Sequence, residues 1–397
     1  MLKNNKGQKA SNTFELIMNP TEEENTSFSA VSEGRLQVWD NQSKDPSVYI
    51  SASGFLNDRQ FGMISLVLVS ISQLCSVVAV ISNSLSITVF VRLGFSEPSN
   101  ISLVALAASD LACAVLLIWA NSCFLLSSMD VRLPFDATNV SYLTGSIQWA
   151  FISRTVAWIT AFISFERCLC ILVPLKVKKL ITSKSTLTAM IVIFIFTFCP
   201  GLNTFIRYRF RWVFYPYMNV TILDVVPLDN ESIIQMDYII TVICGFIQPL
   251  LAFFIVLMCT IFLVIQLRKL SSWRKSVTSA KSQWQHKPGE DPAPNSPPTQ
   301  DRSFRKEERL VRMVVAIATI FIVSYTPTCI MLLCSTIFDE FFFFGVYKRM
   351  YIVCGMATFL AQTISGGVNI LIYYYMASKF RLALRCLLRL DRQEHEK

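Results

Sequence analysis

The chain has 397 residues, of which 53% are hydrophobic and 16% charged, and its formal net charge is +9. Soluble domains carry about 25% charged residues, so this composition indicates a membrane protein. The positive charge lies on short segments between apolar runs, which argues against a nucleic-acid partner. Only two histidines are present, His286 and His395, and both lie in polar stretches, which argues against a histidine-based catalytic or zinc site.

A helix that crosses a membrane needs about 20 mostly apolar residues. Residues 1–60 are polar and contain no apolar core of the kind a cleaved leader needs, so we expect the first span to be an uncleaved anchor. We predict an all-α fold: an extracellular, glycosylated, mostly disordered tail at 1–61, and a seven-transmembrane helix bundle in 62–376. The seven spans are expected near 62–91, 100–127, 143–173, 186–206, 238–266, 311–335 and 351–376.

The charged segments and the glycosylation motifs predict the same orientation. Lys and Arg gather after spans three, five and seven, which places these segments in the cytoplasm by the positive-inside tendency. Asn-x-Ser/Thr motifs on the opposite side place that side in the lumen or outside the cell. We therefore predict a plasma-membrane protein with an extracellular N-terminus and a cytoplasmic C-terminus. The predicted glycosylation sites are Asn25, Asn41, Asn139, Asn219 and Asn230.

Two cytoplasmic segments have distinctive composition. The sequence KPGEDPAPNSPPTQD at 287–301 is rich in proline and charge, and we expect disorder over about 272–304. In 377–397, apolar residues from Phe380 to Leu388 and arginines fall on opposite faces of a short helix, which predicts an interfacial helix against membrane lipids. Cys386 in this helix is an expected palmitoylation site, and the alternative is a frayed tail with a free thiol.

Polar residues inside the spans are few, and such residues usually face the interior of a bundle and have a function. Together they resemble the markers of rhodopsin-like (class A) G-protein-coupled receptors, over about residues 62–390. The segment FERCLCILVPLKVKKLIT further resembles divergent invertebrate, particularly molluscan, chemosensory and neuropeptide-like receptors. The markers are Asn83 in AVISNSL, Asp110 in LVALAASDLA, Glu166-Arg167-Cys168, Pro174-Leu175, Pro249, Phe321 with Pro327 in FIVSYTP, and Asn369 with Tyr373 in NILIY.

The sequence also departs from this family at several positions. Tyr142 stands where the family usually has a disulfide-bonded cysteine, and residues 207–237 contain no cysteine to pair with it. Cys334 and Cys354 are an alternative pair whose geometry the sequence cannot give. Tyr325 replaces the family's toggle tryptophan. Ile370 replaces the proline after Asn369, and Gly366-Gly367 are expected to supply backbone slack instead.

The resemblance implies an activation switch and a docking surface for a heterotrimeric G protein. Arg167 would be neutralised by Glu166 and by Glu307, and outward movement of span six would release it. The alternative is that Glu166 and Arg167 only mark the membrane boundary. Tyr325, Asn369 and Tyr373 complete the expected switch. The expected docking residues are Arg167, Pro174, Leu175 and Lys176.

The resemblance further implies a polar core of Asn83, Asp110, Ser365 and Asn369. Asp110 is an expected sodium site, although Val156 stands where a serine ligand is usual; the alternative is a protonated Asp110 that packs helices. No other cofactor is expected.

The expected ligand pocket lies closer to the outer side. Arg154 is predicted to contact an anionic ligand, and the alternative is that it pairs with polar groups against span four or five. Trp149 argues against amine ligands, and Thr363, in place of the retinal lysine, argues against an opsin. The expected pocket residues are Trp149, Ser153, Arg154, Tyr325, Cys329, Phe359 and Thr363.

The sequence therefore predicts a receptor, not an enzyme, for a small-molecule or peptide ligand. A transporter or channel is the alternative. That class needs discontinuous helices or pore-lining charges, and the charge inside these spans is sparse.

Overall fold

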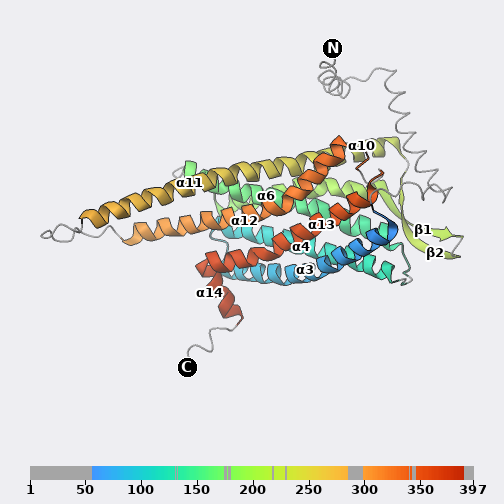
Figure 1. Ribbon diagram of the computed structural model, residues 1–397, viewed down its shortest axis with the longest axis horizontal. Helices are drawn as coiled ribbons and strands as arrows, with labels where there is room; N and C mark the ends of the chain where they lie inside the picture. The colour runs from blue at the N-terminus through green and yellow to red at the C-terminus, as the bar shows by residue number, and fades with distance from the viewer. Residues whose placement is uncertain are drawn as a thin grey trace, which may run out of the picture. The chain divides into compact units, whose positions relative to one another are not determined.

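The structure is a computed structural model of the full chain. It describes residues 56–129, 131, 133–173, 177, 180–216, 219–228, 230–284, 298–338, 340–341 and 346–388, without the side chains of 270–284 and 298–307. Among these residues, seven helices are long and apolar enough to cross a membrane. The predicted all-α bundle with seven spans is therefore confirmed (Figure 1).

The seven spans comprise four continuous helices and three spans that are interrupted by irregular turns. The third span joins α5 (Ala137–Ser141), a π-helical turn η2 (Tyr142–Ser146) and α6 (Ile147–Leu172). The fifth joins α10 (Glu231–Val242), a π-helical turn η4 (Ile243–Ile247) and α11 (Gln248–Trp284). The other spans are α3 (Asp58–Leu93), α4 (Pro98–Ser128), α8 (Ser183–Phe198) with η3 (Cys199–Asn203) and α9 (Thr204–Arg207), α12 (Pro298–Ile337), and α13 (Lys348–Met376).

Three prolines inside the spans lie where the helices change geometry. Pro200 lies in the 3₁₀ turn η3, and Pro249 follows η4 by two residues. Pro327 lies inside α12, where it cannot donate a hydrogen bond to the carbonyl of Val323. Each proline therefore leaves a carbonyl of the preceding turn without its helical partner, which permits a bend or a wider turn at that point.

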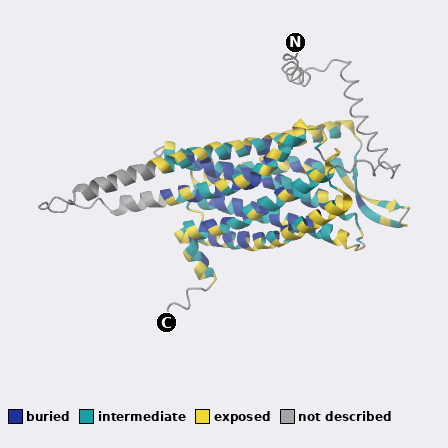
Figure 2. Cartoon of the chain, viewed as in Figure 1, coloured by how far each residue is buried: buried dark blue, intermediate teal, exposed yellow. Residues whose placement is uncertain are grey.

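Burial divides the helices into inner and outer faces (Figure 2). The inner faces carry buried residues such as Leu106, Ile159 and Val256, whereas large apolar side chains such as Leu74 and Met258 are exposed. Exposing so many large apolar side chains to water is unfavourable in free energy, whereas contact with lipid is not. The burial pattern therefore agrees with a bundle whose outer surface contacts hydrocarbon.

One end of the bundle carries a β-hairpin. Strands β1 (Tyr208–Tyr215) and β2 (Val220–Pro227) are antiparallel, with Tyr208 opposite Pro227 and Tyr215 opposite Val220. Leu223 exchanges backbone hydrogen bonds with the segment before α5: Asp136 donates to it at 2.8 Å, and it donates to Pro134 at 3.0 Å. We call this the hairpin end, and we call the opposite end, where α6 stops, the Arg167 end.

At the Arg167 end, the short helix α14 (Ser378–Leu387) follows α13 (Figure 1). Its residues Phe380 and Leu384 are buried, and the Phe380 ring lies 5.0 Å from that of Phe90 on α3. The helix predicted after span seven is therefore present. Part of its apolar face packs against the bundle rather than outward, whereas Leu388 is exposed.

The structure corrects the predicted extent of several helices. Helix α11 continues to Trp284 and α12 begins at Pro298, so parts of the segment expected to be disordered over 272–304 are helical. The reason is local: residues 270–284 contain no proline or glycine, and the first of these after Trp284 are Pro288 and Gly289. Proline is tolerated in the first turn of a helix, which permits a start at Pro298.

Candidate functional site

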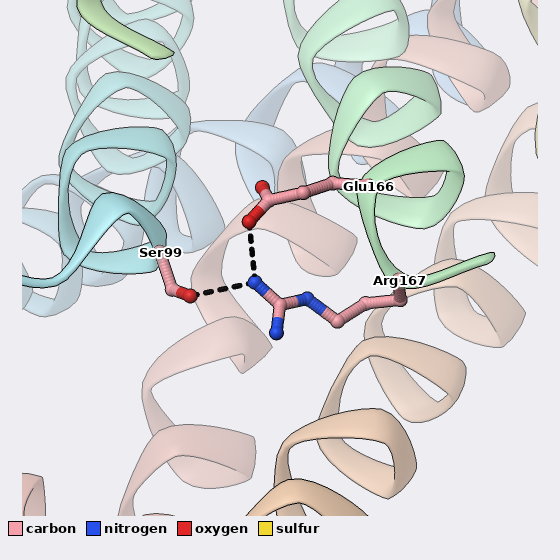
Figure 3. Close-up of polar contacts among 3 residues, drawn as sticks. All are labelled: Ser99, Glu166 and Arg167. Carbon is pink, nitrogen blue, oxygen red and sulfur yellow. Dashed lines mark hydrogen bonds and ion pairs between the residues drawn. The ribbon is translucent and has the colours of Figure 1, made fainter. Parts of the chain in front are cut away.

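Arg167 lies near the C-terminal end of α6 and is bonded on two sides (Figure 3). Its Nη2 atom donates to Glu166 Oε1 at 2.5 Å and to Ser99 Oγ at 2.7 Å. The side chains of Arg167 and Glu166 are 11% and 2% exposed. Ser99 belongs to the first turn of α4, so the arginine joins the ends of two helices.

Helix α12 covers this ion pair. Leu310, Met313 and Val314 of α12 line a small cavity together with Ser99, Ser102, Glu166 and Arg167. Glu166 Oε2 and the Ser102 hydroxyl are buried there without a hydrogen-bond partner. The predicted partner Glu307 lies on α12, but its side chain is outside the described residues. The next acid, Glu308, pairs with Arg312 of its own helix.

The expected docking surface is described only in part. Pro174, Leu175 and Lys176 lie outside the described residues, so the structure places only Arg167 of this group. Ser99, which sequence reasoning missed, is a bonding partner of Arg167 that the structure adds. A serine at the start of a helix is common, so the sequence carries no signal that would have distinguished it.

A single internal cavity joins residues that the sequence analysis assigned to two sites. It is lined by Asp110, Ser365 and Asn369 of the polar core and by Trp149, Ser153, Tyr325 and Thr363 of the expected pocket. We call it the Asp110 cavity. Its volume is about 40 Å³. A water molecule needs roughly 10–15 Å³ and ligand pockets span roughly 300–1,000 Å³, so it has room for waters or a small ion.

The polar core is closely packed around the Asp110 carboxylate. Asn369 Nδ2 donates to Asp110 Oδ2 at 3.1 Å, and Asn83 Nδ2 donates to the Gly366 carbonyl at 3.5 Å. A Cβ atom at Gly366 would lie 2.9 Å from Asp110 Cγ. The glycine therefore permits close approach of α13 to α4, and the expectation that Gly366-Gly367 supply backbone slack stays a prediction. Asn83 itself does not line the cavity.

The donor set of the Asp110 cavity fits a monovalent cation with oxygen ligands. Asp110 is the only carboxylate among the lining residues, and the hydroxyls of Thr160, Ser324 and Ser365 accompany it. Within the described part of the chain there is no group of three or more His, Cys, Asp or Glu residues that could hold a metal. This argues against a transition-metal site there. Val156, at the position of the usual serine ligand, lines the cavity without offering an oxygen.

A hydrogen-bonded chain next to this cavity joins three helices. Ser153 Oγ on α6 donates to Gln362 Oε1 on α13 at 2.5 Å, and Gln362 Nε2 donates to Thr328 Oγ1 on α12 at 2.8 Å. Thr328 directly follows Pro327, where α12 lacks a backbone hydrogen bond. Sequence reasoning missed Gln362 because no family marker includes it, although a glutamine within an apolar span is a usable signal.

The remaining pocket residues comprise paired aromatic rings and two side chains outside the Asp110 cavity. The Trp149 ring lies 4.1 Å from that of Phe359, and the Tyr325 ring stacks on that of Phe321 at 4.9 Å. Phe359 does not line the Asp110 cavity. Cys329 does not line it either, and packs with Tyr325 in the core. Arg154 also lies outside this cavity, with its Cζ atom 4.4 Å from the Phe151 ring centroid.

Tyr373 belongs to an aromatic cluster near the Arg167 end. Its ring lies 5.1 Å from that of Phe90 and 5.4 Å from that of Phe380. Its hydroxyl is buried without a hydrogen-bond partner. The structure therefore brings Tyr373 to α3 and α14 but not to Arg167, and its part in the switch stays a prediction.

At the hairpin end, Asp224 is a buried acceptor. Its carboxylate accepts from the Tyr215 hydroxyl at 2.5 Å, from Asn139 Nδ2 at 2.9 Å and from its neighbour Val225 N at 2.7 Å. Asn139, a predicted glycosylation site, thus joins the start of the third span to the hairpin. These bonds, with the backbone pairing of Leu223, hold the hairpin in a chain that has tyrosine at the usual cysteine position.

The other modification sites are partly described. Asn219 is exposed in the hairpin turn with a φ of 52°, and Asn230 caps α10 by accepting from Ile233 N at 3.3 Å. Asn25 and Asn41 lie outside the described residues. None of the 12 cysteines, all of them within the described residues, forms a disulfide, so Cys334 and Cys354 are not paired here, and Cys386 is exposed on α14.

Comparison with known proteins identifies one family. Residues 82–365 match the family model described as "7 transmembrane receptor (rhodopsin family)". No curated protein matches the chain.

Proposed function

Because the chain belongs to the rhodopsin family of seven-transmembrane receptors, we propose that it converts the binding of an extracellular ligand into activation of a heterotrimeric G protein. Members of this family are signalling receptors rather than enzymes. The ligand in this proposal is a chemosensory cue or a peptide. The protein acts in the plasma membrane, as a multi-pass protein.

The proposed orientation places the hairpin end outside the cell. Support comes from Asn139, Asn219 and Asn230, whose glycosylation motifs all lie at that end. Support also comes from Lys379 and Arg381 of α14, which lie at the Arg167 end and follow the positive-inside tendency. The N-terminus is then extracellular and the C-terminus cytoplasmic, where Cys386 is available for palmitoylation.

The observation that carries the proposal is the position of Arg167 beneath α12. The guanidinium is held by Glu166 and Ser99, and Leu310, Met313 and Val314 of α12 lie against the same small cavity. Outward movement of α12 removes those three side chains and opens the Arg167 end to a partner. Arg167, Pro174, Leu175 and Lys176 then form the docking surface for the G protein.

The ligand acts on the Asp110 cavity, which it reaches from the hairpin end of the bundle. Trp149, Ser153, Tyr325 and Thr363 line the Asp110 cavity, which is too small for a ligand as it stands. A ligand therefore has to widen it from the hairpin end. Widening separates α6 and α13 from α12, which strains the bonds of Gln362 next to the proline of α12.

We propose that Asp110 holds a sodium ion in the inactive receptor. Asp110 and the hydroxyls of Ser324, Ser365 and Thr160 would hold the ion, and Asn369 donates to Asp110 Oδ2 and would orient the carboxylate. The ion would supply a positive charge that compensates the buried carboxylate.

Guanine-nucleotide exchange on purified G proteins, with the receptor in nanodiscs, tests the proposed function. The wild-type receptor is expected to accelerate exchange of at least one G-protein subtype above receptor-free nanodiscs. Glu307→Ala is expected to raise ligand-free exchange, because it removes one acid proposed to neutralise Arg167. Glu231→Ala removes an exposed acid at the hairpin end and is the matched control. Exchange at the receptor-free level with every subtype contradicts the proposal.

A further inference from the structure

Arg154 is a charged residue deep in a membrane-spanning helix. It lies thirteen residues before Arg167 on α6, so about 20 Å along the helix axis separates the two. Charged side chains at this depth are costly and pair with another group or contact a ligand. The contacts of Arg154 decide between these two explanations.

None of the residues that the structure describes supplies Arg154 with a counter-charge. Arg154 Nη1 is buried and has no hydrogen-bond partner. The nearest ring is that of Phe151, one turn earlier on the same helix, with its centroid 4.4 Å from Cζ. The other groups that act on the guanidinium are the Tyr325 phenol and the Cys244 thiol, which ordinarily stay uncharged at neutral pH. For the residues that the structure describes, it records no ion pair or hydrogen bond made by Arg154.

Within the described residues, Arg154 makes no hydrogen bond to a polar group of span four or five, which was the alternative expected from the sequence. A buried guanidinium without a partner is unfavourable, because desolvation is not offset by attraction. The cation–π contact with Phe151 offsets only part of this cost, and it leaves the hydrogen-bonding edge of the guanidinium unused. The unused edge suits a planar anion that accepts two hydrogen bonds.

The backbone opposite Arg154 is irregular. The π-helical turn η4 contains Cys244 and Gly245, and a Cβ atom at Gly245 would lie 3.9 Å from Arg154 Nη2. Glycine thus leaves space directly beside the guanidinium. Wide turns of this kind often occur at functional sites, because they displace one helix face from its regular position.

We propose that Arg154 binds a carboxylate group of the ligand, in the space between α6 and Gly245 of η4. This inference rests on the proposed receptor function, and it specifies the chemical class of the ligand. The carboxylate belongs either to a small organic acid or to the free C-terminus of a peptide. The bound anion restores the charge balance of Arg154 and contacts the helix pair next to Tyr325 of α12.

Binding of matched acids and amides to the purified full-length receptor in nanodiscs tests the proposal. The probes are butanoate, octanoate, benzoate and 3-phenylpropanoate, each with its primary amide, and penta-alanine with a free or an amidated C-terminus. At least one acid is expected to bind about tenfold or more tightly than its amide, because one charged hydrogen-bonded pair distinguishes them. A preference among the small acids indicates a small organic acid as the source of the carboxylate, and a preference for penta-alanine with a free C-terminus indicates a peptide.

Three variants test the site itself. Arg154→Met is expected to abolish the difference between acid and amide, and Arg154→Lys to keep part of it, because lysine retains the charge but not the planar fork. Gly245→Leu is expected to weaken acid binding by filling the space beside Nη2. Arg211→Met removes an exposed arginine of β1 and is the control that should bind like the wild type.

The thermal midpoint of the ligand-free receptor gives a second readout that needs no ligand. Arg154→Met is expected to raise it, because the variant removes a buried charge that has no partner. A lower midpoint means that protein groups already satisfy the guanidinium, and the proposal then fails. It fails equally if no acid binds more tightly than its amide, or if Arg154→Met keeps the preference. These readouts do not depend on nucleotide exchange, so failure here is distinguishable from failure of the proposed receptor function.

Discussion

Arg167 Nη2 lies 2.7 Å from the Ser99 hydroxyl, so the Arg167 side chain of α6 is bonded to the first turn of α4 as well as to Glu166 of its own helix. This bond does not involve α12. Ser99 therefore holds the guanidinium in place beneath Leu310, Met313 and Val314 without help from the helix that is proposed to move.

Ser99→Ala is expected to raise ligand-free nucleotide exchange. The loss of one hydrogen bond to a partly buried side chain costs about 1 kcal/mol, which corresponds to roughly a fivefold shift between inactive and active receptor. Exchange is compared at equal receptor concentration with Ser128→Ala, whose exposed hydroxyl bonds only to Leu125 of its own helix. Equal exchange by the two variants shows that Ser99 does not restrain Arg167.

Gln362→Leu is expected to raise ligand-free exchange by a similar factor. The substitution breaks the chain from Ser153 through Gln362 to Thr328, which restrains α12 next to Pro327. Gln73→Leu breaks a bond of the same kind, to Ser122, between α3 and α4. The control is expected to lower the thermal midpoint without changing exchange, because α12 takes no part in that bond. A raised exchange rate in both variants means that general loosening, not the Gln362 chain, is responsible.

Gly366→Ala is expected to destabilise the receptor by about 1–3 kcal/mol, because overpacking displaces neighbouring groups. The added Cβ atom would lie 2.9 Å from Asp110 Cγ. Gly355→Ala, on the same helix, meets nothing within 4 Å and is the matched control. The thermal midpoint and the yield of folded receptor measure the effect. Similar midpoints for the two variants contradict the close approach of α13 to Asp110.

Asp224→Ala is expected to lower the thermal midpoint, because it leaves the Tyr215 hydroxyl and Asn139 Nδ2 without their acceptor. Each of these hydrogen bonds contributes about 1 kcal/mol, because Tyr215 is only partly buried and Asn139 is exposed. Thr221→Ser changes an exposed residue of the same strand, keeps the glycosylation motif of Asn219 and is expected to leave the midpoint unchanged. If Asp224→Ala behaves like Thr221→Ser, the hairpin is held by its backbone pairing alone.

Sodium chloride is expected to raise the thermal midpoint of the wild-type receptor relative to choline chloride at equal ionic strength. A ligand that binds only the folded state stabilises it, and choline is too large for a cavity of about 40 Å³. Asp110→Asn is expected to abolish the difference, whereas Asp237→Asn, which changes a carboxylate bonded to Asn203, should retain it. A sodium effect that survives in Asp110→Asn excludes Asp110 as the site.

The sequence by itself determined the number of spans and the family. Seven runs of apolar residues are set by bilayer thickness, so their count does not depend on how the helices pack. Markers such as Asn83, Asp110 and Arg167 have fixed spacing along the chain, which made the family recognisable. Helix ends were less well determined: α11 and α12 continue beyond their apolar cores, because polar residues can extend a helix once it has begun.

Only the tertiary structure decided which polar side chains meet. Gln362 with Ser153, Asn139 with Asp224, and Ser99 with Arg167 are each separated by dozens of residues or more in the sequence. It also showed that α13 approaches Asp110 closely at Gly366 and that, among the described residues, Arg154 Nη1 has no hydrogen-bond partner. Hydropathy records how a residue interacts with solvent, whereas such pairings depend on the rotation of each helix about its axis. That rotation is fixed only when all seven helices pack together.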